Sequence, residues 1–221
     1  MRKLIFVLLC YSSVVFGQTK NDLQRAKLVG NISMLTEKEY VAKDGKAERG
    51  ELKSKSVSEY GAAGNKLSFV TYGPANELLS KSVFTYDSDG ALVDVKRYRG
   101  DGGLNVTTVY TYDKVGNETA ESNKDASGTV FMTAKSKFDL NGNRIVYDRY
   151  DLFGHLFLRS NFKYDKRGNE IQEREFDSHE SLQFVTTWQY ISFDKQGNWT
   201  ERVMLKNDEP RTITVREITY R

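Results

Sequence analysis

The side chains most capable of chemistry in this sequence are carboxylates that recur at regular intervals. Five aspartates of the main repeat motif are each followed three residues later by a glycine, namely Asp87 with Gly90, Asp113 with Gly116, Asp139 with Gly142, Asp165 with Gly168 and Asp194 with Gly197. Two carboxylates that flank a glycosidic bond can hydrolyse it, so a secreted hydrolase acting on polysaccharide is one alternative. A catalytic pair is a unique arrangement, whereas these aspartates occur in nearly every unit of a repeat. We therefore predict structural turn residues, no catalytic residues and no enzyme activity.

Metal and cofactor chemistry have little support in the sequence. The segments 87–90 and 139–143 offer oxygen ligands for calcium, but neither is followed by the glutamate of an EF-hand loop. His155 and His179 are the only histidines and Cys10 is the only cysteine, which argues against histidine-rich and thiolate metal sites. Neither a Gly-x-Ser-x-Gly segment nor a phosphate-binding glycine loop occurs. We expect no metal and no cofactor.

Aromatic residues near the C-terminus provide the best candidates for ligand binding. Trp188, Tyr190 and Trp199 lie close together, and exposed rings of this kind can stack on sugars. The alternative, which we favour, is that these rings pack in the core. His179 lies in the unit that is three residues longer than the others, where a binding loop or a β-bulge could occur. We favour a lengthened solvent loop there.

The elements that must position these residues follow from the repeat. Tyr60, Tyr86, Tyr112, Phe138 and Tyr164 are 26 residues apart, and Phe193 follows after 29. In a turn, the aspartate accepts hydrogen bonds from the backbone ahead and the glycine takes a left-handed conformation, which together close a β-hairpin. A second turn follows each first one by about 12 residues, and the segments between turns are rich in β-branched and aromatic residues. We predict an all-β protein, an antiparallel β-hairpin meander of roughly 12–14 strands.

The width of such a sheet restricts its shape. At about 4.8 Å per strand it would be roughly 60 Å wide, so it must coil or close. Because the aromatic residue of each unit recurs at the same height, we predict a long twisted sheet that coils around this row of rings. Asp148 beside Arg149, and Glu173 beside Arg174, put charge on both faces. This argues against an outer-membrane barrel, whose lipid-facing surface tolerates few charges.

The N-terminus has the pattern of a signal peptide. A basic pair, Arg2 and Lys3, precedes an apolar run at 4–9 and small residues that lead to Gly17. We predict cleavage after Gly17 and export to the periplasm, the cell surface or the medium. The apolar run is about half of the roughly 20 residues that a membrane-spanning helix needs, so the mature chain should not span a membrane. Lipidation of Cys10 is the less favoured alternative.

Basic and acidic residues are nearly balanced, at 33 against 30, for a net charge of +3. They are interleaved along the chain, as in Asp165-Lys166-Arg167, so no basic stripe is evident. Phosphate-binding surfaces concentrate lysine and arginine on one face. We therefore predict no nucleic-acid partner.

The Tyr-Asp-x-x-Gly-Asn motif and its weaker second Tyr-Asp-x-x-Gly turn, between residue 60 and about residue 200, resemble the YD-repeat, or RHS-like, family of exported bacterial proteins. This resemblance implies a β-sheet protein of the cell surface or medium, and carbohydrate binding has been attributed to the repeats of some members. Gly61 in place of the aspartate and Ala91 in place of the asparagine depart from the motif.

We expect three segments: a signal peptide at 1–17, N-terminal capping strands at 18–59 and the repeat sheet at 60–221. The function that follows is a non-catalytic binding or scaffold module at the bacterial cell envelope, with a carbohydrate or another envelope protein as its partner. A hydrolase would need paired carboxylates in a groove, and a purely structural envelope component would lack a concave surface.

Overall fold

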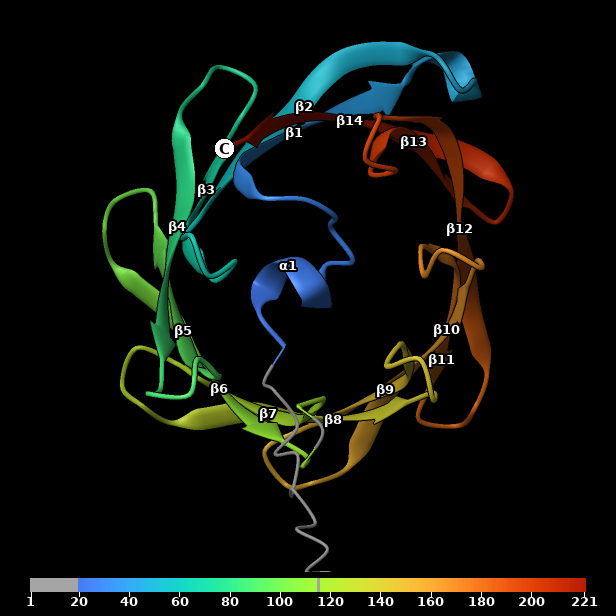
Figure 1. Ribbon diagram of the computed structural model, residues 1–221. Coiled ribbons are helices and arrows are strands. Elements are labelled where there is room, and N and C mark those ends of the chain that lie inside the picture. Colours follow the sequence, from blue (N-terminus) through green and yellow to red (C-terminus); the bar gives the residue numbers. More distant parts are fainter. Residues whose placement is uncertain (1–19, 115) are drawn as a thin grey trace, which may run out of the picture.

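The computed structural model describes residues 20–114 and 116–221. A single antiparallel sheet of 14 strands runs through this part of the chain in sequence order and closes into a barrel. Figure 1 looks down the barrel and shows the short helix α1 (Asp22–Arg25) inside the ring of strands. The strands are β1 (Ile32–Ala42), β2 (Arg49–Tyr60), β3 (Lys66–Tyr72), β4 (Leu78–Tyr86), β5 (Leu92–Arg99), β6 (Leu104–Tyr112), β7 (Glu118–Lys124), β8 (Val130–Phe138), β9 (Arg144–Tyr150), β10 (Leu156–Tyr164), β11 (Glu170–Asp177), β12 (Leu182–Phe193), β13 (Trp199–Lys206) and β14 (Glu209–Tyr220).

The barrel confirms the predicted all-β class, but the prediction of an open, coiled sheet is wrong. β1 pairs with β14 from Ile32 opposite Tyr220 to Val41 opposite Thr212. The closing strand thus comes from the segment 18–59, which lacks the repeat motif. Because each described strand has a neighbour on both sides, the sheet presents no free edge for the pairing of a second chain.

Regularly spaced β-bulges explain why the sheet closes. Tyr86 pairs with Leu92, whereas Thr85 pairs with Asp94, which leaves Val93 without an opposite residue. The same shift follows the other turns of this type, at Leu67, Thr119, Ile145, Ile171 and Thr200. The turns at the other end of the barrel are followed by a similar shift. A bulge bends its strand and increases the local twist, so curvature is added twice in every unit until the two edges meet.

The predicted turn residues lie in the tight turns that join the strands. The Asp139 carboxylate accepts the N–H groups of Asn141 at 2.9 Å and Asn143 at 2.8 Å, and Gly142 has a φ of +72°. These backbone hydrogen bonds lower the pKa of Asp139. We call the six turns at 60–65, 86–91, 112–117, 138–143, 164–169 and 193–198 the repeat turns. Because each unit contributes two antiparallel strands, all six lie at one end of the barrel.

Residues 20–31, which we call the plug, cross the lumen at this end. The Leu23 N–H donates to the Gly64 carbonyl at 3.2 Å, and the Val29 N–H donates to Asn198 Oδ1 at 2.8 Å. α1 begins with a capping box between Asn21 and Gln24. Leu23 and Leu28 of the plug form a core cluster with Ile32, Leu35 and Tyr60 of the barrel wall. The plug is therefore held by both hydrogen bonds and apolar contacts.

The predicted signal peptide at 1–17, its cleavage site after Gly17 and Cys10 lie outside the described residues. Within the residues that the structure describes, no helix is long and apolar enough to cross a membrane.

Candidate functional site

The repeat turns place one inward-facing side chain per unit just inside the barrel. The residue six positions after each aromatic pairs with that aromatic: Lys66, Leu92, Glu118, Arg144, Glu170 and Trp199. Residues directly opposite each other in a pair share a face of the sheet. Four of the six residues are charged, and three of these, Glu118, Arg144 and Glu170, lie on every second strand from β7 to β11. The candidate site is lined by four residues of this ring, Glu118, Arg144, Glu170 and Trp199.

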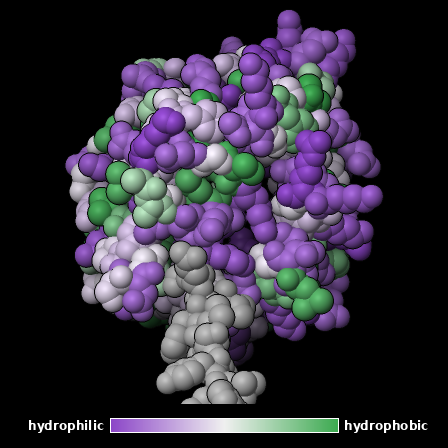
Figure 2. Space-filling model, in the orientation of Figure 1, coloured by the Kyte–Doolittle hydropathy of each residue, from purple (hydrophilic) through white to green (hydrophobic). Residues whose placement is uncertain are grey.

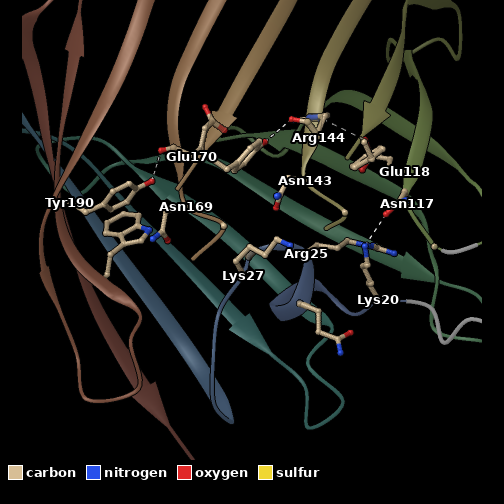
Figure 3. Close-up of a pocket in the computed structure, with 18 of the residues that line it drawn as sticks. Lys20, Arg25, Lys27, Asn117, Glu118, Asn143, Arg144, Asn169, Glu170 and Tyr190 are labelled. Atoms are coloured by element: carbon tan, nitrogen blue, oxygen red, sulfur yellow. Dashed lines mark hydrogen bonds and ion pairs between the residues drawn. The ribbon is translucent and has the colours of Figure 1, made fainter. Parts of the chain in front are cut away.

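A cavity of about 350 Å³ lies between the plug and this ring. Figure 3 shows Lys20, Arg25 and Lys27 of the plug facing Asn117, Asn143 and Asn169 of three successive repeat turns. A second cavity of about 240 Å³ lies beside the plug and shares Lys27, Asn169, Trp199 and Arg216 with the first. The mouth of the barrel is thus divided by the plug rather than filled by it.

Positive charge dominates the lining of the larger cavity. It contains six basic side chains, Lys20, Arg25, Lys27, Arg144, Arg202 and Arg216, against the two carboxylates of Glu118 and Glu170. Arg25 pairs with Asp22 at 3.4 Å, and Arg216 pairs with Glu37 at 2.9 Å. Among the described residues, Lys20, Lys27 and Arg202 have no acidic group within ion-pair distance. An anion that entered the cavity would therefore meet cations that the protein itself does not neutralise.

Three asparagines present amide groups in a fixed orientation. The Asn143 Nδ2 donates to Asp139 at 2.9 Å, and the Asn169 Nδ2 donates to Asp165 at 2.9 Å. Because the nitrogen is held by the turn, the amide oxygen is the free end of each group. In Asn117 that oxygen accepts a hydrogen bond from Lys20 at 2.8 Å. The Asn143 Oδ1 is buried without a hydrogen-bond partner among the described residues.

Burial perturbs both carboxylates of the cavity. It raises the pKa of Glu118 to about 7, against the opposing effect of Arg144, whose Nη1 lies 3.9 Å from the carboxylate. Burial likewise raises the pKa of Glu170 to about 7, and the nearby Glu173 adds to this rise. Both groups therefore change charge near neutral pH, within a cavity that is otherwise positive.

Aromatic rings and guanidinium groups form the C-terminal side of the cavity. The rings of Tyr190 and Trp199 lie 5.7 Å apart between centroids, and the Tyr190 hydroxyl donates to the Glu170 carbonyl at 2.7 Å. The Arg216 guanidinium lies 3.3 Å from the centroid of the Trp199 ring, and the Arg202 guanidinium lies 4.5 Å from it. Burial lowers the pKa of Arg216. Trp199 is only 6% exposed, so it packs as part of the wall.

The structure separates the four residues proposed from the sequence as ligand-binding candidates. Tyr190 and Trp199 line the cavity. Trp188 lies two residues deeper on the same face of β12, opposite Met204. His179 lies in the turn at the other end of β12, where its N–H donates to Asp177 at 2.8 Å. These four residues do not form one site.

We expected the three extra residues of the last unit to lengthen the loop at His179, and this prediction is wrong. The Asp177 N–H donates to the Ser181 carbonyl at 3.0 Å, the same span as in the equivalent turn at Asp151 and His155. Instead β12 has 12 residues where β10 has 9. One residue of this longer strand, Ile191, has no opposite residue in the pairing with β13.

From the sequence we did not identify the plug or the basic residues that the strands contribute to the cavity, Arg144, Arg202 and Arg216. A signal was present, because the inward residue always stands six positions after the aromatic of the motif. The plug residues carry no repeat, so only the structure brings Lys20, Arg25 and Lys27 to the cavity. In residues 20–114 and 116–221 no cluster of three histidine, cysteine, aspartate or glutamate side chains is placed to hold a metal ion.

No family model matches the sequence. No curated protein matches it either. Among solved structures, a porin-like protein from Bacteroides uniformis superposes with a TM-score of 0.51 at 12% sequence identity, over 86% of this chain and 98% of that one. At this identity, the similarity shows a shared fold.

Two further structures are more distant. A domain described as an outer membrane lipoprotein-sorting protein domain from Vibrio parahaemolyticus has a TM-score of 0.36 at 10% identity, over 89% of each chain. The TcdB2-TccC3-TEV structure has a TM-score of 0.32 at 13% identity and covers 72% of this chain but 12% of that one. At these scores neither structure supports an argument about this protein.

Proposed function

We propose that this protein is a non-catalytic binding module, exported to the bacterial cell envelope, that holds a small acidic ligand in the cavity between the plug and the repeat turns. The observation that carries this proposal is the charge of the lining, six basic side chains against two carboxylates. The concave cavity favours binding over a purely structural role. The fold shared with a porin-like protein is compatible with an envelope location.

The signal peptide and the relationship to YD-repeat proteins remain part of this proposal. The six repeat turns at one barrel end agree with the regular spacing on which that resemblance rests. A carbohydrate ligand fits the mixture of aromatic rings, amides and cations in the cavity. An acidic sugar would use all three, because its carboxylate would bind arginine and its ring would stack on Tyr190.

A hydrolase is less well supported. Glu118 and Glu170 are the two carboxylates of the cavity, and their pKa values near 7 would suit acid–base catalysis. They lie on β7 and β11, four strands apart, which is roughly 19 Å along the wall at about 4.8 Å per strand. The carboxyl groups of glycosidases are about 5–10 Å apart. The positively charged Arg144 stands between them on β9.

The proposal can be tested by fluorescence titration. The chain has two tryptophans, so a Trp188→Phe background leaves Trp199 in the cavity wall as the reporter. We expect D-glucuronate and inorganic sulfate to quench it saturably, and glucose to leave it unchanged. Arg202→Gln should weaken binding of both anions about tenfold or more, because a charge-assisted contact is lost.

The matched control is Arg99→Gln. Arg99 is an exposed arginine at the end of β5, at the opposite end of the barrel from the repeat turns, so this variant should bind the anions as the parent does. Absence of saturable quenching by either anion would refute the proposed site. An equal response to glucose would show that charge does not govern binding.

Anion affinity should depend on pH through Glu118 and Glu170. Both carboxyl groups are neutral below about pH 7, which makes the cavity more positive, and both ionise above it. We expect the affinity for sulfate, which keeps its charge throughout, to rise about three- to tenfold from pH 8 to pH 6, as two negative charges are removed from the lining. Glu118→Gln with Glu170→Gln should bind tightly at both pH values. A pH-independent affinity in the unsubstituted protein would contradict the assignment.

A further inference from the structure

The outer wall formed by β4 to β11 separates positive from negative side chains. Residues that pair across neighbouring strands share a face of the sheet. The row Ser136–Tyr147–Ser160–Glu175 faces the lumen, because Ser160 lies four residues before Tyr164 on β10, and Tyr164 lines the cavity. Successive residues of a strand point to opposite faces, so the rows on either side of this one face outward.

Basic residues occupy these outward rows. Lys135 pairs with Asp148, which pairs in turn with Arg159, and the next row begins at Lys137 and ends at Arg174. Over β4 to β11 the outward positions carry eight basic residues against two acidic ones. The basic residues are Lys81, Lys96, Lys124, Lys135, Lys137, Arg159, Lys163 and Arg174, and the acidic residues are Asp94 and Asp148.

The acids that balance these charges in the sequence face the lumen. Glu121 accepts a hydrogen bond from Tyr147 at 2.5 Å, and Glu175 pairs with Arg149 at 2.9 Å. We took the interleaving of basic and acidic residues in the sequence as evidence against a basic stripe. The structure shows that this inference is wrong for the outward face of β4 to β11. In a strand, alternation with a period of two puts opposite charges on opposite faces.

Little of the outward positive charge is cancelled locally. Arg159 binds both oxygens of Asp148, at 2.6 and 2.9 Å, so this acid neutralises one basic residue. Lys81, Lys96, Lys137 and Lys163 are exposed and have no acidic partner within ion-pair distance in the part of the chain that the structure describes. Figure 2 views the same end of the barrel as Figure 1, where hydrophilic residues cover most of the visible surface and hydrophobic residues lie among them.

We propose that this outward face of β4 to β11, which we call the basic wall, binds an extended acidic polysaccharide. The wall spans eight strands, roughly 34 Å at about 4.8 Å per strand, so a single small ion reaches only a few of its cations. A polymer that carries one anionic group per sugar can contact many of them and release their counterions together.

Aromatic rings beside the cations favour a polysaccharide. Lys81 pairs with Tyr98 across the strands, and the Lys135 ammonium lies 5.3 Å from the centroid of the Tyr150 ring. Arg159 pairs with Phe176 in the same manner. A ring beside a cation matches a sugar ring beside its carboxylate or sulfate group. The choice of a polysaccharide over nucleic acid rests on the proposed export of the protein.

The test uses polygalacturonate as the acidic polymer, with dextran of similar length as the neutral control. We expect the protein to bind polygalacturonate, with an affinity that falls steeply with added salt, and to leave dextran unbound. Lys96→Gln, Lys137→Gln and Lys163→Gln together should weaken binding about tenfold or more and reduce the slope of log affinity against log salt by about three. Within residues 20–114 and 116–221, none of these three lysines forms an ion pair.

A matched triple variant on the opposite wall controls for net charge. Lys43→Gln and Lys46→Gln in the β1–β2 hairpin, with Lys195→Gln in the β12–β13 turn, remove the same charge at exposed positions. This triple variant should change the affinity less than about threefold. Equal losses in the two triple variants would overturn the assignment to this wall, as would binding of dextran. Tighter binding of a DNA duplex than of polygalacturonate would refute the polysaccharide. Arg202→Gln should bind the polymer normally, so this result is independent of the cavity.

Discussion

Replacing Trp199 with alanine is expected to lower the free energy of unfolding by about 3–5 kcal/mol, the usual cost of deleting a large buried aromatic side chain. The ring is 6% exposed and lies against Tyr190. It also covers the guanidinium groups of Arg216 and Arg202 at 3.3 and 4.5 Å. Its removal would leave a void and two partly buried cations without their aromatic neighbour. Urea unfolding followed by circular dichroism measures the change.

Two further variants make this result specific. Trp199→Phe keeps an apolar ring and should cost less than about 1.5 kcal/mol. Phe153→Ala, which removes a ring that is 76% exposed, should change stability by less than about 0.5 kcal/mol. If Trp199→Ala were no more destabilising than Phe153→Ala, the ring would not be part of the packed wall.

Replacing Asp22 with alanine should detach the plug from the barrel. Its carboxylate accepts the Lys66 N–H at 2.7 Å and the Tyr86 hydroxyl, and it pairs with Arg25. Burial raises the pKa of Tyr86, so this hydroxyl remains a donor throughout the physiological range. We expect the free energy of unfolding to fall by about 3–5 kcal/mol, because the Lys66 N–H and the Arg25 guanidinium lose their acceptor. The Tyr86 hydroxyl can still donate to the Lys66 carbonyl at 2.8 Å.

Hydrogen exchange distinguishes detachment of the plug from general destabilisation. The Leu23 and Val29 N–H groups bond to Gly64 and Asn198 of the repeat turns. In Asp22→Ala their exchange should accelerate more than that of amides in β6 and β9. Glu51→Ala, at an exposed position of β2, should leave both unchanged. Protection of Leu23 at the native level in Asp22→Ala would show that the carboxylate does not hold the plug.

Some of this architecture could be predicted from the sequence because turn chemistry is local. Asp139, Gly142 and Asn143 interact with one another within five residues, so their spacing alone predicts a hairpin. The repetition of that spacing predicts the all-β class and the approximate number of strands. These inferences need no knowledge of distant parts of the chain.

Closure and the binding cavity depend on distant contacts, which the repeat does not encode. The pairing of β1 with β14 joins residues such as Leu35 and Ile218, and β1 lacks the motif altogether. Bulges such as Val93, which curve the sheet, leave no mark in the residue types of the turn. The cavity depends on Lys20 reaching Asn117, almost a hundred residues away. The charge of each face of the sheet could not be predicted, because the sequence alone did not show which side chains point into the lumen and which point outward.

The pairing of the first strand with the last has a consequence for how the chain acquires its structure. Hairpins between β2 and β13 can form one after another as soon as their own residues are present, because each needs only its sequence neighbour. The hydrogen bonds between β1 and β14 join residues separated by nearly the whole described chain. Closing so long a loop has a large entropic cost, so we expect this pairing to form last. Until Tyr220 is available, an incomplete molecule exposes two unpaired strands and is at risk of aggregating with others.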